Sequence, residues 1–214
     1  MITVHHLGIS QSDRIVWLCE ELGIPYHLKL YERTNGGRGG GPPEYKALYP
    51  FGTAPVIYDG DLVLGESAAI IEYLVARYGD GRLVLQPDHP NFTDYLYWFH
   101  FANGSMMPSM MVELGIQMAG GAEARERMRA FLSRSERAFD VVNRRLGDAT
   151  YFAGDEFTAA DIMMLFPLTT MRLFTPRDLA PYPNILAYLQ RIGARPAYRR
   201  ACRKADPNLT PYLT

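Results

Sequence analysis

The sequence predicts an α/β domain over residues 1–80, a linker over 81–90 and an all-α helical domain over 91–214. Three observations support this fold class. A strand, a helix and a second strand follow one another in the first 31 residues, a hairpin leads into a helix before the linker, and strand signals stop after it. The length of 214 residues fits two small domains.

The first three elements predict a strand–helix–strand unit. Ile2–His6 and Tyr26–Tyr31 are expected to be strands, and Gly23 ends the helix between them. Such a crossover is right-handed and pairs its two strands in parallel. Cys19 belongs to the apolar face of the helix, so we interpret it as core packing. The apolar face consists of Ile15, Val16, Leu18, Cys19 and Leu22.

A β-hairpin is predicted next. Pro55 opens a short apolar run, and proline, which has no N–H, is tolerated at the first residue of a strand. Asp59-Gly60 is a two-residue turn signal. This signal makes Pro55–Tyr58 and Asp61–Leu64 antiparallel partners.

The helix that follows the hairpin begins at Ser67. The free N–H groups and the positive dipole end of a helix N-terminus attract anions, and the Ser67 hydroxyl adds a polar group there. Serine is also a preferred helix cap, so both a ligand role and a capping role stay open. The apolar positions of this helix keep a 3.6-residue period: Ile70, Ile71, Leu74, Val75 and Tyr78.

Beyond the linker the pattern is helical. Phe92–Met118, Thr158–Met171 and Asn184–Ile192 are predicted as helices. Thr158 and Asp161 form a capping-box variant, so we interpret Asp161 as structural. A further helix is indicated by apolar residues at three- and four-residue spacings: Met128, Phe131, Leu132, Phe139, Val142 and Leu146.

Composition excludes several classes of function. The net charge is −1; residues 1–80 carry 6 basic and 10 acidic side chains, and residues 81–214 carry 16 and 13, so no nucleic-acid partner is expected. No stretch has the roughly 18 apolar residues of a membrane span, and the N-terminus lacks the features of a secretory signal, so we expect a cytoplasmic protein with no membrane partner. A basic cluster near the C-terminus is interpreted as a solvated helix face: Arg195, Arg199, Arg200, Arg203 and Lys204.

Phe51–Tyr58 and Glu66-Ser67 together resemble the glutathione-binding half of cytosolic glutathione transferases, whose N-terminal domain is thioredoxin-like. The resemblance covers essentially the whole chain. It implies a cis Ala54–Pro55 bond, a backbone contact from Ala54 to the cysteine of glutathione, and contacts from Glu66 and Ser67 to the γ-glutamyl end. Family members often have lysine or glutamine at the position of Thr53. Because this chain has threonine there, we expect weaker binding of the glycyl carboxylate.

The glycine-rich segment at 35–43 lacks the ending of a phosphate loop. We favour a spacer that precedes a short second helix. The other interpretation is a loop that orders over glutathione, with Arg38 or Lys46 meeting its glycyl carboxylate.

Ser10 is the predicted catalytic residue. Glutathione attacks as a thiolate, and lowering a thiol pKa by about two units requires about 2.7 kcal/mol, which one hydrogen bond to a charged acceptor nearly supplies. Only Cys19 and Cys202 occur and there is no C-x-x-C motif, so the thiol comes from elsewhere.

The position of Ser10 supports this role. Ser10 stands at the mouth of the first helix, four residues before Arg14, as the catalytic serine does in theta-like and delta-like transferases. Residues 1–25 contain no tyrosine, which argues against the tyrosine-type classes. Ser12 is the alternative donor, and a capping box from Ser10 to Asp13 is the structural alternative.

Methionine gathers in one predicted helix. Its soft side chain suits an adaptable apolar wall, so we assign Met107, Met110 and Met111 to the electrophile pocket, with core packing as the alternative. No metal is expected, because His5 and His6 lack a second pair of ligands and alternate on a strand.

The leading interpretation is an enzyme that conjugates glutathione, its co-substrate, to small apolar electrophiles or reduces organic peroxides with it. The resemblance also implies a homodimer. The alternative is a non-catalytic transferase-like binding or dimerisation module.

Overall fold

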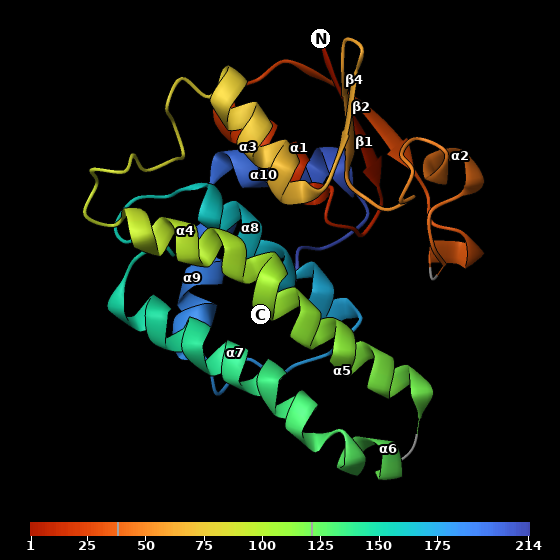
Figure 1. Cartoon of the computed structure of the whole chain (residues 1–214), viewed down its shortest axis with the longest axis vertical. Coiled ribbons are helices and arrows are strands. Elements are labelled where there is room, and N and C mark those ends of the chain that lie inside the picture. Colours follow the sequence, from red (N-terminus) through yellow and green to blue (C-terminus); the bar gives the residue numbers. More distant parts are fainter. Residues whose placement is uncertain (38, 121) are drawn as a thin grey trace. The chain divides into compact units, whose positions relative to one another are not determined.

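The computed structural model describes residues 1–37, 39–120 and 122–214 (Figure 1). Backbone contacts divide the chain into two compact units, residues 1–84 with 193–211 and residues 85–192 with 212–214. The first unit is thioredoxin-like and the second is helical, which confirms the predicted fold class. The sequence-based division followed the loss of strand signals, whereas this division follows contacts and places the helix at 196–205 in the first unit.

The first unit contains a four-stranded mixed sheet in the order β2-β1-β3-β4. β1 and β2 are parallel, as the strand–helix–strand pattern predicted, and β3 is antiparallel to both β1 and β4. The strands are β1 (Ile2–Leu7), β2 (Tyr26–Tyr31), β3 (Val56–Asp59) and β4 (Leu62–Gly65).

The hairpin is confirmed, but its turn lies one residue later than predicted, so Tyr58 pairs with Val63 and not with Asp61. Asp59 pairs with Leu62, so the two-residue turn is Gly60-Asp61 and not Asp59-Gly60. Gly60 has φ 62°, and such hairpin turns require a positive φ at their first central residue, where glycine costs least. Pro55 consequently lies just before β3, and the Ala54–Pro55 bond is cis as expected.

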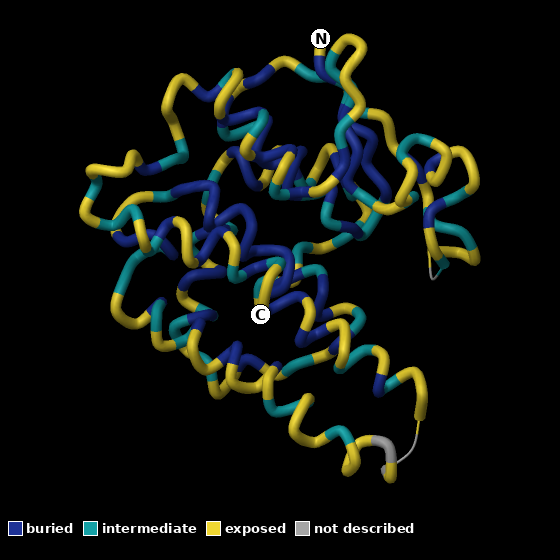
Figure 2. The backbone as a smooth tube through the Cα atoms, in the orientation of Figure 1, coloured by how far each residue is buried: buried dark blue, intermediate teal, exposed yellow. Residues whose placement is uncertain are grey.

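Helices cover both faces of this sheet (Figure 1). α1 and α3 pack together on one face. On the other face, Tyr45 of α2 packs against Leu7, Tyr31 and Val56. Figure 2 shows β1 as mostly buried. The helical elements of this unit are α1 (Asp13–Leu22), the short turn η1 (Asn35–Gly37), α2 (Pro43–Lys46), α3 (Ser67–Tyr78) and α10 (Pro196–Ala205).

α10 packs on α1, and this contact adds ion pairs to the basic cluster, four of whose five residues are exposed as predicted. Arg195 donates two hydrogen bonds to the carboxylate of Glu21, each 2.8 Å long. Arg200 and Lys204 both pair with Glu20. The cluster therefore joins two helices through ion pairs instead of forming only a solvated face.

The second unit is helical, apart from an isolated bridge between Tyr151 and Gly154. The predicted helix at 92–118 is α4 and α5 with a wider π-helical turn, η2, between them. No described helix is both long and apolar enough to span a membrane. The elements are α4 (Phe92–Phe101), η2 (Ala102–Met106), α5 (Met107–Ala119), α6 (Ala122–Arg127), α7 (Arg129–Asp148), α8 (Ala159–Leu168), η3 (Thr170–Leu173) and α9 (Pro183–Gly193).

The capping box at the start of α8 is confirmed. The Thr158 hydroxyl accepts from the backbone N–H of Ala160, and the Asp161 carboxylate accepts from the N–H of Thr158 over 2.9 Å. Asp161 also accepts from the N–H of Phe152 and from the hydroxyl of Tyr188. The carboxylate is completely buried and joins three segments of the second unit, which agrees with a structural role.

Candidate active site

The turn between β1 and α1 carries Ser10 and has an uncommon backbone conformation. Ile9 has φ 53°, in the left-handed region that β-branched residues rarely adopt. Asp206 accepts from the N–H of Ile9 over 3.2 Å, and Arg33 donates to the carbonyls of Gly8 and Ile9 over 2.8 Å each. Strained residues persist where neighbours hold them on several sides, and they gather at functional sites. This turn fits both descriptions.

Ser10 and Ser12 are hydrogen-bonded to each other. Their hydroxyl oxygens lie 2.7 Å apart, and Ser10 is also placed to donate to the carbonyl of Leu7 over 2.6 Å. α1 begins at Asp13 with Ser12 at the N-cap, and the Ser12 side chain makes no capping hydrogen bond. The Ser10 hydroxyl also accepts from the N–H of Ser12 over 3.3 Å, so the structural alternative for Ser10 stays open beside the thiolate role.

The hydroxyl pair continues into β1 and α10. Ser12 Oγ lies 2.9 Å from Nδ1 of His6, and Nε2 of the same ring lies 3.1 Å from Asp206 Oδ2. His6 is buried and Asp206 is partly exposed. Sequence reasoning missed both residues. The strand position of His6 gave no signal for this contact, and Asp206 is 200 positions away in the sequence.

Glu66 and Ser67 lie at the N-terminus of α3, where both were expected. Ser67 is the first helical residue and is buried, whereas Glu66 is the N-cap, is exposed and has φ 68°. Ser67 therefore does not occupy the cap position. Its hydroxyl accepts from Nη1 of Arg14 over 3.0 Å.

Arg14 is a component of the site that the sequence indicated only by its spacing from Ser10. Its side chain is fully buried, and burial lowers the pKa of its guanidinium to about 10, so it stays charged at neutral pH. It donates to the side chain of Gln11 and to Ser67. Arg14 thus joins the turn that carries Ser10 to the N-terminus of α3.

The segment before β3 completes the set of predicted glutathione ligands. Pro55 is buried, Ala54 is half-buried and Thr53 is exposed. Ala54 packs against the cluster formed by Leu7, Tyr31, Tyr45 and Val56.

The glycine-rich segment is held by hydrogen bonds among its described residues. The N–H groups of Gly37 and Gly39 donate to the carbonyl of Thr34, and the N–H of Thr34 donates to the carbonyl of Gly40. Lys46, at the end of α2, is exposed. Arg38, the other residue considered for the glycyl carboxylate, lies outside the described residues.

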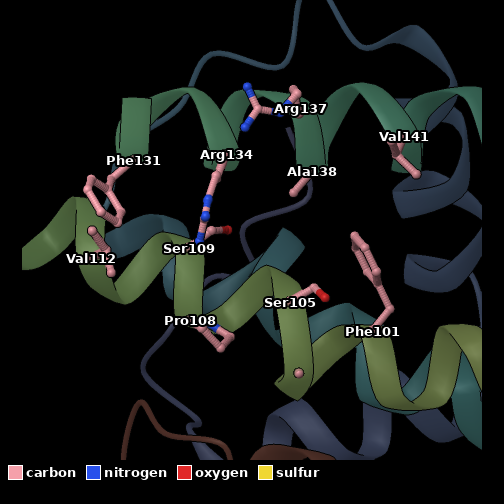
Figure 3. Close-up of a pocket in the computed structure, with 11 residues that line it drawn as sticks. Phe101, Ser105, Pro108, Ser109, Val112, Phe131, Arg134, Arg137, Ala138 and Val141 are labelled. Atoms are coloured by element: carbon pink, nitrogen blue, oxygen red, sulfur yellow. The ribbon is translucent and has the colours of Figure 1, made fainter. Parts of the chain in front are cut away.

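The second unit has a pocket of about 440 Å³, shown in Figure 3. Its walls come from α5 and α7, with Val112 facing Phe131, and Phe101 of α4 closes one end. Met107, Met110 and Met111 do not line it. Met107 and Met110 are buried, which agrees with the alternative that these methionines pack in the core. In contrast, 51% of Met111 is exposed. Their role in binding an electrophile stays a prediction.

The first unit has a cleft of about 600 Å³ at the end of β2. It is bordered by His6, Arg33 and Asp206, together with the glycines of η1. The His6–Asp206 pair therefore lies against a solvent-accessible cleft. Within the described part of the chain, no three histidine, cysteine or carboxylate side chains gather as a metal-ligand group.

Comparisons with known proteins agree with this fold. The model of the glutathione S-transferase N-terminal domain matches residues 5–82, and that of the C-terminal domain matches residues 109–196. The Schizosaccharomyces pombe protein named Glutathione S-transferase 3 is 36% identical over 224 residues, covering 97% of this chain and 89% of that protein.

Solved structures show the same relationship. A glutathione S-transferase from Actinobacillus pleuropneumoniae has a TM-score of 0.86 and 35% identity, covering 100% of this chain and 99% of that one. A theta class enzyme from Xanthomonas axonopodis pv. citri, solved with glutathione bound, has a TM-score of 0.70 and 28% identity, covering 94% and 96%.

A thioredoxin-like unit with a cis-proline before β3, followed by a helical unit, defines the class of thioredoxin-fold transferases. Within that class, the chain belongs to the glutathione S-transferase family.

Proposed function

We propose that this chain is a serine-type glutathione transferase, in which Ser10 stabilises the glutathione thiolate and the product is a conjugate with a small apolar electrophile. The observation that carries the proposal is the N-terminus of α3. Glu66 holds an exposed carboxylate in a positive-φ conformation beside the Ser67 hydroxyl and the first N–H groups of the helix.

This arrangement matches the γ-glutamyl end of glutathione, which is a free amino acid head with one ammonium and one carboxylate. The Glu66 carboxylate attracts the ammonium. The helix N-terminus, Ser67 and the buried charge of Arg14 attract the carboxylate. Ala54, beside the cis bond, supplies backbone groups for the cysteine, and Thr53 is the remaining neighbour of the glycyl end.

The thiolate requires one donor at Ser10. A hydrogen bond to a charged acceptor contributes about 1.5–3 kcal/mol, which corresponds to lowering a thiol pKa by about one to two units. Ser10 lies at the N-terminal end of α1, whose dipole adds to the same effect.

Retention on immobilised glutathione, followed by turnover of a chromogenic aryl halide and of an organic hydroperoxide, tests the proposal. Retention with halide turnover supports the transferase, and added hydroperoxide turnover supports peroxide reduction as a second activity. Retention without any turnover identifies a binding module, and failure to bind glutathione overturns the proposal.

We also propose a homodimer, on the basis of the family resemblance and because most soluble oligomers are two-fold dimers. Light scattering at micromolar protein is the test. A mass near the 24.2 kDa of one chain contradicts the proposal.

A further inference from the structure

Four side chains form one continuous hydrogen-bonded chain that starts at the candidate thiol site. The order is Ser10, Ser12, His6 and Asp206, and the successive distances are 2.7, 2.9 and 3.1 Å. Ser10 and Ser12 belong to the turn before α1, His6 to β1, and Asp206 follows α10. Three separate parts of the first unit thus converge on one line of polar atoms.

The contacts of His6 assign its neutral tautomer. A carboxylate accepts hydrogen bonds and has none to donate, so the Nε2 that faces Asp206 carries the ring hydrogen. Nδ1 is then an acceptor, and the hydroxyl hydrogen of Ser12 points at it. The Ser12 oxygen in turn faces the hydroxyl of Ser10. Ser10 Oγ lies 2.6 Å from the carbonyl of Leu7 and 2.7 Å from Ser12 Oγ, so its hydrogen turns from that carbonyl to Ser12 when a proton moves toward His6.

We propose that His6, held by Asp206, receives the thiol proton of glutathione through Ser10 and Ser12. This inference rests on the proposed function, because it requires a thiol beside Ser10. His6 and Asp206 do not touch the substrate and act as positioning residues through the two serines.

The proton transfer is balanced within the chain of groups. The thiol hydrogen moves to Ser10 Oγ, the hydrogen of Ser10 moves to Ser12 Oγ, and the hydrogen of Ser12 moves to His6 Nδ1. One S–H bond breaks and one N–H bond forms, while the sulfur keeps the electron pair. Both serines end as hydroxyls, and Ser10 then donates the former thiol hydrogen to the thiolate. His6 ends as an imidazolium against the Asp206 carboxylate.

The Asp206 carboxylate is in direct contact with the His6 ring and would attract a positive charge there. Arg33 opposes the imidazolium, but its donated hydrogen bonds go to the carbonyls of Gly8, Ile9 and Gly39. Burial raises the pKa of the Cys202 thiol to about 11, so Cys202 stays neutral. The neighbour of His6 in β2 is the uncharged Leu30.

The far end of the chain of groups reaches solvent. His6 and Asp206 both border the 600 Å³ cleft, and 19% of the Asp206 side chain is exposed. A proton held by His6 therefore has a route to water that does not pass through the thiol site. In the proposed relay, His6 keeps the proton while the thiolate charge is present, and the proton leaves by this route after the thiolate has reacted.

The test counts protons. Glutathione is mixed with the protein at pH 7 in a weakly buffered indicator solution, and thiolate formation is followed by its ultraviolet absorbance. S-methylglutathione, which lacks the thiol, gives the proton change from all other groups. In the wild type we expect thiolate to form with little proton release to solvent, because His6 keeps the proton. His6→Asn retains an acceptor for Ser12 but cannot hold the proton, so we expect close to one proton released per thiolate.

Asp206→Asn is the second variant, because it keeps the shape and an acceptor for Ile9 while it removes the charge. We expect intermediate proton release and a higher apparent pKa in the pH profile of kcat/KM. His27→Asn, at an exposed position of β2, is the matched control and should behave as the wild type.

Wild-type thiolate formation with full proton release overturns the relay while leaving the proposed function intact. The relay is also overturned if His6→Asn and Asp206→Asn both match the wild type. Absence of thiolate or of glutathione binding in the wild type overturns the proposed function itself.

Discussion

Arg14 in α1 donates a hydrogen bond to the hydroxyl of Ser67 in α3, with Nη1 and Oγ 3.0 Å apart. A buried guanidinium thus stands directly behind the serine that is proposed to bind the γ-glutamyl carboxylate. Because the surroundings are dry, the charge of Arg14 is screened less than a surface charge would be. The Arg14–Ser67 hydrogen bond joins the start of α1 to the proposed ligand site at the start of α3.

Ser67→Ala should weaken glutathione binding more than it weakens the fold. Loss of one hydrogen bond to a charged group costs about 1.5–3 kcal/mol, which is roughly a tenfold or greater rise in Kd. Calorimetric titration gives the Kd and thermal melting gives the stability. Ser133→Ala, whose hydroxyl donates within α7, is the control. An unchanged Kd with a lowered Tm would contradict the ligand role.

Ser10→Ala should lower kcat at least tenfold, about 1.4 kcal/mol of transition-state stabilisation, with little change in glutathione affinity. The reason is that the variant loses the donor to the thiolate but keeps the sites at α3. Steady-state kinetics across pH 6–9 measure the effect. Equal rates for the variant and the wild type would remove Ser10 from the mechanism, and Ser12→Ala in the same assay tests the alternative donor.

Asp161 should make the fold more stable in mild acid than at pH 7.5. Burial raises its pKa to about 6 from an ordinary value of 3.8, although its hydrogen bonds act in the opposite direction. The folded state therefore binds the proton more tightly than the unfolded state does. The resulting stability is complete below the unfolded pKa and is lost as pH rises through about 6.

Melting of the wild type and of Asp161→Asn at pH 5 and 7.5 checks this. The stability of the wild type relative to the variant should be greater at pH 5, by about 1 kcal/mol. A difference of the opposite sign would show that the hydrogen bonds to the carboxylate outweigh its burial.

The Glu21–Arg195 pair should contribute more than a surface ion pair. It is bidentate, and only 9% of the Glu21 side chain is exposed. A double-mutant cycle with Glu21→Gln and Arg195→Gln should give a coupling energy of about 1–2 kcal/mol. The control is the exposed pair Glu123–Arg127 in α6, where about 0.5 kcal/mol or less is expected. Equal couplings for the two pairs would contradict the expectation.

Local sequence patterns predicted the features that depend on neighbours in the chain. The parallel strands, the helix from Ser67 and the capping box at Thr158 each follow from residues within one segment. The turn of the hairpin was placed one residue too early, because the turn signal did not say which position of the turn Gly60 occupies.

Features that depend on distant residues were not predictable in this way. The basic residues of α10 look solvated until Glu20 and Glu21 of α1 are placed beside them. The same holds for His6, because nothing near it in the sequence indicates its partner. Predictions of ligand residues came from the family motifs, since backbone contacts such as that proposed for Ala54 have no side-chain signature.

The return of α10 to the first unit has a consequence for the nascent chain. Asp206, which contacts both His6 of β1 and the strained turn at Ile9, is translated about 200 positions after them. Domains generally begin to fold during synthesis, N-terminal segments first. The sheet can therefore assemble early, whereas the turn that carries Ser10 acquires its last supports only after the helical unit has been translated. A partly synthesised chain would hold the sheet without the finished turn at Ser10.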